Sequence, residues 1–318
     1  MSAPRSYYGQ PVIKEPVWTP EIPWYFFAGG LAGASAGLAY LADRTGNDVL
    51  ARRAWPAALG GVGVSPLLLI SDLGVPSRFL NMLRMFKVTS PMSVGSWILA
   101  ASGAATSVAA LHSMTGAFPR LAAVAGPAAA ALGLPLSTYT AALIAQTAVP
   151  VWHEARHELP VIFAAGAAAS AGATAAIATP VAYAGPARRL AVLGSMAELA
   201  TVPLMEHRLG ALADAYQSPD AEPFTRAARL LTATGGLLLA GAARRRRAAA
   251  VAGGALVLGG AACERWSVFR AGLVSARDPA YTVAPQRDRV RTGRGLGAIR
   301  RAAGTAVRTA AAQARAGG

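Results

Sequence analysis

The sequence predicts an all-α integral membrane protein: a bundle of about eight transmembrane helices, with a short interfacial helix and a basic C-terminal tail. Hydrophobic residues make up 54% of the 318-residue chain, and charged residues only 14%, against about 25% charged in ordinary soluble domains. Eight apolar runs have about 20 residues, the length that crosses a hydrocarbon core about 30 Å thick. The alternative, a soluble helical protein with an Ala-rich core, is disfavoured because so many apolar runs would leave it no polar surface.

The eight runs divide the chain into predicted crossings. They cover residues 23–43, 54–73, 93–115, 128–149, 160–180, 187–207, 224–243 and 248–266. The fourth run is rich in Ala and Pro, and the seventh begins with Arg226 and Arg229, so these two are the weakest. Small residues inside several runs, as in AGGLAGASAG, suit close packing of membrane helices. We therefore expect a polar N-terminal segment over 1–22, a transmembrane domain over 23–272 and a flexible Arg-rich tail over 273–318.

Between the second and third crossings lies the segment PSRFLNMLRMFK, which begins at Pro76. Its apolar residues Phe79, Leu83 and Phe86 recur at helical spacing, with Arg78 and Arg84 among the polar positions. This pattern predicts a helix that lies in the headgroup plane, with its basic side toward lipid phosphates. In a second interpretation this helix supports a docked soluble subunit. Spacing alone favours the simpler interpretation, a connecting helix.

An even number of crossings places both chain ends on one side, which we call the terminal face. Lys and Arg in the short loops number nine on this face and ten on the opposite face, so the positive-inside rule is nearly balanced. The arginines of the tail then favour cytoplasmic termini in a bacterial cytoplasmic membrane. The tail itself is expected to be disordered or to lie along anionic lipid or an acidic partner. It lacks stacking aromatics, so nucleic acid is not an expected partner.

Three stretches of the chain resemble the NrfD family, the membrane subunits of polysulfide reductase: DLGVPSRFLNMLRMFKVTSPMSVGSW, IPWYFFAGGLAGASAG and LPLSTYTAALIAQTAVPVWHE. The resemblance covers roughly residues 7–285, and its most specific parts are the motif over 72–78 and the pair Tyr139–Thr140. It implies a subunit that exchanges electrons between the quinone pool and a docked ferredoxin-like iron–sulfur subunit. That subunit in turn serves a molybdopterin catalytic subunit of the formate dehydrogenase or polysulfide reductase type.

A quinone site needs hydrogen-bond partners that change protonation, together with apolar walls for the ring and tail. Tyr139 matches the tyrosine that hydrogen-bonds quinone in the family. Tyr25 occupies about the place where some relatives have a histidine, Glu21 lies one turn before it, and Asp72 closes the second crossing. We expect these four residues to bind menaquinone or ubiquinone as an exchangeable substrate, with menaquinone the favoured pool. This quinone site is the only chemistry expected of the chain.

Acidic residues gather in the half of the predicted bundle nearer the terminal face. Ionisable groups inside a membrane are costly and are functional candidates by default. Glu198 lies at mid-depth in the sixth crossing and Glu206 at its end, so both are predicted to relay protons. Pairing of Glu198 with a neighbouring helix is the alternative. His153 and Glu154 are expected in a wet loop that contacts a partner. Arg78 and Arg84 of the interfacial helix are expected to contact a partner or the membrane interface.

Other cofactor chemistries lack the residues they need. The single cysteine, Cys263, cannot supply the four thiolates that an iron–sulfur cluster usually takes. Of the four histidines, His112 lies in the third crossing near the opposite end of the bundle from the other three, so a bis-histidine haem is not expected. Two rival functions remain: a secondary transporter or proton-translocating protein without a redox partner, and an anchor without a quinone site. A transporter would be expected to have two similar halves, and residues 23–149 and 160–266 show no convincing match.

Overall fold

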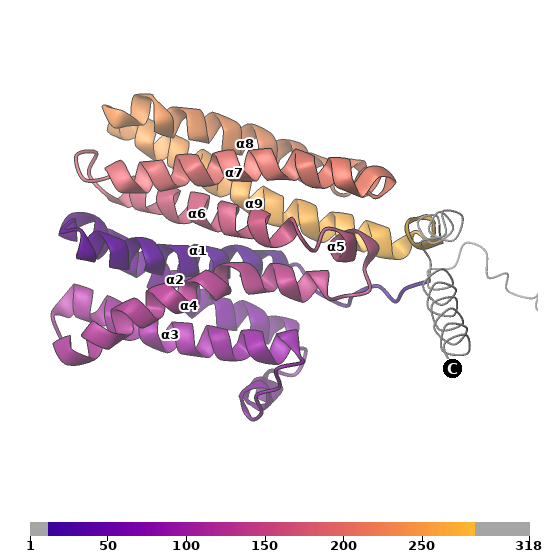
Figure 1. Ribbon diagram of the computed structural model, residues 1–318, viewed down its shortest axis with the longest axis horizontal. Helices are drawn as coiled ribbons and strands as arrows, with labels where there is room; N and C mark the ends of the chain where they lie inside the picture. The colour runs from indigo at the N-terminus through magenta and orange to yellow at the C-terminus, as the bar shows by residue number, and fades with distance from the viewer. Residues whose placement is uncertain (1–11, 284–318) are drawn as a thin grey trace, which may run out of the picture.

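The computed structural model describes residues 12–283, and the regular structure in this range is entirely helical (Figure 1). The first eleven residues and the tail from residue 284 onward, with its predicted flexibility, lie outside the described residues. The long helices are α1 (Glu21–Arg44), α2 (Asp48–Asp72), α3 (Pro91–Thr115), α4 (Pro119–Ala145), α6 (Leu159–Ala178), α7 (Gly185–Leu209), α8 (Glu222–Ala240) and α9 (Arg247–Arg277). The short elements are α5 (Pro150–Glu154) and the 3₁₀ helices η1 (Pro76–Leu83), η2 (Gly210–Gln217) and η3 (Ala242–Arg244).

Each predicted crossing coincides with a long helix. Five of these helices, α1, α2, α3, α4 and α6, are long and apolar enough to cross a membrane. Crossing by α7, α8 and α9, which carry more charge, stays a prediction. Helix α4 extends over 119–145 rather than 128–149, because its internal prolines are tolerated in a membrane helix whose neighbours satisfy the freed backbone groups.

The last helix is also longer than predicted. Helix α9 continues to Arg277, eleven residues beyond the apolar run that predicts the eighth crossing. Arg265 and Arg270 therefore both lie within this helix. The charged pair Glu264–Arg265 mimics a helix boundary in the sequence, yet both side chains are buried.

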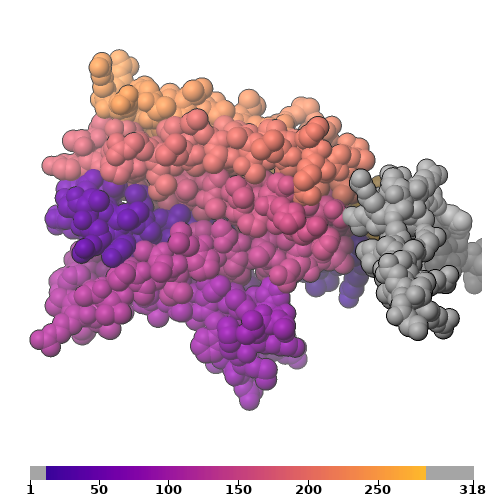
Figure 2. Space-filling view, in the orientation of Figure 1, coloured from indigo at the N-terminus to yellow at the C-terminus, as the bar shows by residue number. Residues whose placement is uncertain are grey.

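The long helices run along one axis in two groups (Figure 1). Helices α1 to α4 form one group and α6 to α9 the other, with α1 packed against α6 along the seam. The last residues of α9, the helix α5 and the first described residues all lie at one end of the molecule, as the terminal face requires. The space-filling view shows the two groups in continuous contact, with the segment around η1 projecting from the first group (Figure 2).

Helices approach one another most closely at small residues. A Cβ atom added at Gly33 of α1 would overlap the carbonyl oxygen of Gly133 in α4, and the reverse also holds. The same backbone-to-backbone approach recurs between α6 and α7 and between α8 and α9, at Gly172, Gly194 and Gly235. Such contacts are typical of membrane helices, where dispersion between backbones replaces the hydrophobic effect.

The interfacial segment is shorter than predicted. The 3₁₀ helix η1 ends at Leu83, so the helix expected to continue through Lys87 is wrong. The Ser93 hydroxyl explains the end: it donates to the Met85 carbonyl (3.0 Å) and accepts from the Lys87 amide (3.0 Å), which turns the chain back toward α3. No residue of η1 is buried, and Leu80, Met85 and Phe86 are all more than half exposed, so the segment keeps an apolar outer surface.

Substituting Gly33 by Ala should lower the unfolding temperature of the detergent-solubilised protein. The new methyl group meets the Gly133 backbone, which cannot move aside as a side chain can, and overpacking of this kind costs about 1–3 kcal/mol. Gly37→Ala is the matched control, because it lies one turn along the same helix with open space around it. Thermal unfolding followed by intrinsic fluorescence measures both, and equal unfolding temperatures would contradict the assigned helix contact.

Candidate functional site

One cavity lies in the first helix group, where the predicted quinone residues meet. Tyr25, Tyr139 and Asp72 all line it, so three of the four residues proposed from the sequence converge. The remainder of the wall is mainly apolar and comes from α1 to α4, η1 and the segment before α1: Trp18, Ile22, Phe26, Leu69, Met82, Met92, Ser96 and Leu143. Glu21 is not part of the wall, although it opens α1 beside Ile22.

The two phenol rings form the centre of this tyrosine pocket. Their centroids lie 6.4 Å apart at an interplanar angle of 68°, an edge-to-face arrangement. The Tyr139 ring rests on Gly95 of α3, where any Cβ would overlap the ring. Tyr25 is 2% exposed, and its hydroxyl has no hydrogen-bond partner among residues 12–283. A buried phenol without a partner is a donor available to a ligand or a water.

The segment before α1 closes the pocket at the terminal face. The Asp72 carboxylate accepts two hydrogen bonds from Thr19, one from the backbone amide (2.9 Å) and one from the hydroxyl (2.7 Å). Trp18 stacks on Trp152 of α5 with ring centroids 5.4 Å apart. Trp152 in turn donates to the Val268 carbonyl of α9 (2.7 Å), so the segment is tied to both helix groups.

The tyrosine pocket is small. Its volume is about 40 Å³, which accommodates one or two waters, whereas sites for organic ligands usually measure about 300–1,000 Å³. A quinone ring therefore requires the walls to move. Met82 and Met92 are the flexible parts of the wall, and Met82 belongs to η1, which has no buried residue.

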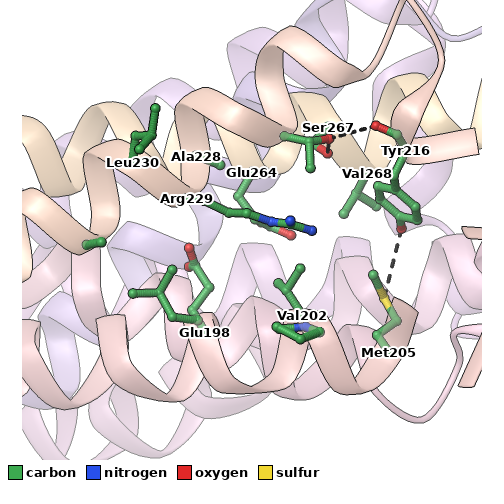
Figure 3. Close-up of a pocket in the computed structure, with 14 residues that line it drawn as sticks. Glu198, Val202, Met205, Tyr216, Ala228, Arg229, Leu230, Glu264, Ser267 and Val268 are labelled. Carbon is green, nitrogen blue, oxygen red and sulfur yellow. Dashed lines mark hydrogen bonds between the residues drawn. The ribbon is translucent and has the colours of Figure 1, made fainter. Parts of the chain in front are cut away.

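A second cavity, of about 330 Å³, lies in the other helix group among α7, η2, α8 and α9 (Figure 3). Glu198 of α7 and Glu264 of α9 face it from opposite sides, in walls that are otherwise mostly apolar. Leu199 and Pro203 of α7 and Leu230 of α8 contribute to those walls, and Pro203 and Leu230 are exposed. The cavity is thus bounded by residues on the outer surface between α7 and α8.

Three buried ionisable residues form what we call the carboxylate cluster: Glu198, Glu264 and Arg265, each at most 4% exposed. The Arg265 guanidinium pairs with Glu264, donates to the Phe163 carbonyl (2.9 Å) and stacks over the Phe163 ring at 3.9 Å. The Thr232 hydroxyl donates to Glu198 (3.4 Å). One oxygen of each carboxyl, Glu198 Oε2 and Glu264 Oε1, has no partner within residues 12–283. Two acids thus share one buried cation.

Hydroxyl groups extend from this cavity toward the terminal face. Thr225 and Ser267 are hydrogen-bonded at 2.6 Å, and Thr225 also donates to the Tyr216 carbonyl (3.2 Å). The Tyr216 hydroxyl contacts the Met205 sulfur at 3.9 Å (Figure 3). Burial first, and then the carboxyls of Glu264 and Glu206, raise the pKa of Tyr216 in η2, so its phenol stays protonated.

A pair of phenylalanine rings separates the two sites. Phe26, which lines the tyrosine pocket, lies 5.7 Å from Phe163 between ring centroids. Phe163 carries Arg265 on its face. The structure therefore divides the predicted residues: Tyr25, Tyr139 and Asp72 belong to one site, and Glu198 belongs to another behind this aromatic partition.

The remaining predicted residues lie nearer the surface. Glu206 forms an ion pair with the half-exposed Arg229 rather than facing the cavity. Arg78 lies in η1 and Arg84 directly after it, both exposed. His153 and Glu154 lie in α5, and the His153 ring contacts the Ala145 carbonyl at 3.2 Å.

The sequence analysis missed three site residues: Trp18, Glu264 and Arg265. Adjacent opposite charges in an apolar run are the signal that could have revealed Glu264 and Arg265.

These features define a multi-pass helical membrane protein with a tyrosine pocket and a separate buried ion cluster. The chain belongs to the NrfD family: the family described as Polysulphide reductase, NrfD, matches residues 11–213. Family membership indicates a membrane subunit of a molybdopterin oxidoreductase complex. The match covers the tyrosine pocket and Glu198 but ends before α9, which supplies Glu264 and Arg265. Curated proteins contain no significant match to this chain.

Replacing Arg265 by Gln should destabilise the protein strongly. The change leaves a buried acid without its cation, a loss of about 3–5 kcal/mol in comparable cases. The exposed pair Arg226–Glu222 offers a control, since Arg226→Gln removes a surface ion pair worth about 1 kcal/mol or less.

Thermal unfolding in detergent measures both variants, and the double variant Glu264→Gln with Arg265→Gln should regain much of the loss. An Arg265→Gln protein as stable as the wild type would show that the buried charges are not paired as described.

Proposed function

We propose that this chain is the quinone-reactive membrane subunit of a bacterial respiratory oxidoreductase. In this proposal all eight long helices cross the cytoplasmic membrane, with both termini in the cytoplasm. Electrons pass between menaquinone or ubiquinone in the tyrosine pocket and a docked ferredoxin-like iron–sulfur subunit. That subunit connects to a molybdopterin catalytic subunit of the formate dehydrogenase or polysulfide reductase type.

The observation that carries the proposal is the pairing of two phenols in a mainly apolar pocket at the terminal face. Tyr139 and Tyr25 provide hydroxyls that can hydrogen-bond quinone oxygens, and Asp72 provides a carboxylate within the same wall. Ile22, Phe26 and Leu143 provide apolar surface for the ring. Reduction of a quinone takes up two electrons and two protons, so oxygens next to titratable groups are a requirement of the chemistry.

Entry of the quinone is proposed to displace η1. Because the pocket has room for little more than water, the ring must push aside Met82 and Met92. Of the two, Met82 lies in a segment that packs loosely, since η1 buries none of its residues. The apolar outer surface of this segment, with Leu80 and Phe86, is suited to lie against acyl chains from which a quinone arrives.

The docked subunit is proposed to cover the terminal face. Exposed basic side chains at this end include Arg78 and Arg84 beside the pocket, and the imidazoles of His153 and His157 lie on the surface near α5. Trp18 and Trp152 stack directly beneath this surface, between it and the tyrosine pocket. An iron–sulfur cluster in the partner would thereby lie on the side of the membrane where the quinone ring is bound.

Glu198 is proposed to relay protons as part of the carboxylate cluster rather than at the quinone itself. Two acids with one cation retain a carboxyl that can hold a proton, both line the cavity, and each has an oxygen without a partner within residues 12–283. The hydroxyls of Thr225 and Ser267 extend the polar path toward the terminal face. Because Phe26 and Phe163 separate the cluster from the tyrosine pocket, transfer between them needs water or movement of these rings.

The rival functions make different demands on the same residues. A transporter without a redox partner would use the larger cavity and have no need for the tyrosine pair. An anchor without quinone chemistry would need neither site. The buried Tyr25 hydroxyl, which has no partner within residues 12–283, favours the quinone site over both, since a structural phenol normally finds a partner when buried.

Tyr139→Phe should reduce quinone-linked turnover of the purified complex about 100-fold, the lower range for loss of a positioned proton donor. Electron transfer from the catalytic subunit to an artificial dye should be unchanged. Tyr40→Phe in α1 removes the same hydroxyl from a tyrosine outside the pocket and serves as the control. Wild-type quinone turnover in Tyr139→Phe would rule out the tyrosine pocket as the reaction site.

Glu198→Gln should slow quinone-linked turnover while leaving the affinity for a quinone-site inhibitor within about twofold of wild type. The amide keeps the shape of the side chain but cannot carry a proton, so only the proton-coupled step suffers. Turnover and inhibitor binding are measured on the same preparation, with Glu206→Gln as a surface comparison. Full turnover in Glu198→Gln would exclude it from the relay, and a matching loss of inhibitor binding would indicate a role in quinone binding instead.

A further inference from the structure

A third pocket lies at the end of the molecule opposite the terminal face, between the start of α7 and the end of α8. Its volume is about 320 Å³, which is within the range of ligand sites. Three arginines line it: Arg188 and Arg189 from the first turn of α7, and Arg244 from η3. The other lining residues are Gly185, Val192, Leu193, Leu239 and Ala240.

The positive charge of this arginine pocket is not balanced by acids. No ion pair within residues 12–283 includes any of the three arginines. Arg188 donates to the Val181 carbonyl (3.0 Å), which fixes its guanidinium at the pocket wall, and it is close enough to Arg189 and Arg244 to be repelled by both. Three like charges around one cavity favour an anionic ligand.

The pocket also has an apolar side that points along the helices. Val192 and Leu193 follow the arginines by one turn on α7, and Leu239 lies near the end of α8, before Arg244 of η3. Leu193 of α7 is 63% exposed and Leu237 of α8 is 75% exposed. Apolar surface therefore continues outward from the pocket between the two helices. The arginines at the helix ends suit a charged headgroup, and the exposed apolar residues one turn toward the middle of the helices suit an acyl chain. An amphiphile has both parts.

We propose that the arginine pocket binds an anionic phospholipid. The headgroup phosphate lies among Arg188, Arg189 and Arg244, and an acyl chain runs along Val192, Leu193 and Leu239. Arginines suit the phosphate of such a headgroup, because the guanidinium forms strong charge-assisted hydrogen bonds with phosphate oxygens. A soluble anion would have no use for the apolar wall, which is why a lipid is the favoured occupant.

Binding is measured by native mass spectrometry of the full chain in detergent, titrated with phosphatidylglycerol or with phosphatidylcholine of the same acyl chains. The variant is Arg189→Gln with Arg244→Gln, because both side chains are exposed and neither forms a side-chain hydrogen bond or ion pair within residues 12–283. Arg52→Gln with Arg53→Gln is the matched control, with the same charge change on the same end of the molecule but outside the pocket.

Wild type should bind phosphatidylglycerol more tightly than phosphatidylcholine, and the pocket variant should lose about fivefold in affinity for each arginine removed. The control variant should keep wild-type affinity, and inorganic phosphate at millimolar concentration should not displace the lipid. Equal affinity for the two lipids in the wild type, or equal losses in both variants, would overturn the proposal. Displacement by phosphate would assign the pocket to a soluble anion instead.

A filled pocket provides an independent test that leaves the charges in place. Ala240→Trp introduces a ring beside Leu239 and should reduce phosphatidylglycerol binding in a protein whose unfolding temperature matches the wild type. Undiminished lipid binding in this folded variant would show that the lipid rests on the arginines without entering the pocket, and would also overturn the proposal.

Discussion

The contact between the backbones of Gly33 and Gly133 fixes how α1 lies against α4, and the tyrosine pocket follows from it. Ser137 adds a hydrogen bond to the Gly30 carbonyl across the same contact (3.4 Å). Counted from the two glycines, Tyr25 lies about 12 Å and Tyr139 about 9 Å toward the terminal face, at 1.5 Å per residue. The phenols meet because the helices cannot slide past each other without a clash at this point. Gly95 then lets the Tyr139 ring lie on α3.

The second helix group obeys a different constraint, the cost of charge in a low-dielectric interior. Glu198, Glu264 and Arg265 compensate one another only in part, and the Phe163 carbonyl and ring complete the surroundings of the guanidinium. The Phe26–Phe163 pair keeps this cluster apart from the tyrosine pocket. In the proposed function, quinone chemistry and proton storage therefore occupy separate halves of one bundle, with an aromatic partition that water must cross.

The apolar runs of the sequence were sufficient to predict the positions of the long helices, although α7, α8 and α9 carry more charge than the other five. Tyr139, Tyr25 and Asp72, which the sequence assigned to one quinone site, line a single pocket. The sequence-based prediction failed where charged residues lie inside a helix that continues past them. Glu264 and Arg265 were taken for the end of the eighth crossing. The sequence does not show that Phe163 and Glu198 on neighbouring helices lie next to these charges in the folded protein. The early end of η1 depends on Ser93, whose two hydrogen bonds to the preceding turn leave no periodic signal. The small size of the tyrosine pocket also depends on side-chain packing.

The most direct test of the account is the site at which a photoreactive quinone labels the purified complex. An azido-quinone, activated by light and mapped by peptide mass spectrometry, should attach to residues 18–26, 92–96 or 139–143, which line the tyrosine pocket. Excess unlabelled quinone should prevent the labelling. Competable labelling confined to the walls of the larger cavity, around residues 198–205 or 225–233, would contradict the assignment and move the quinone to the carboxylate cluster.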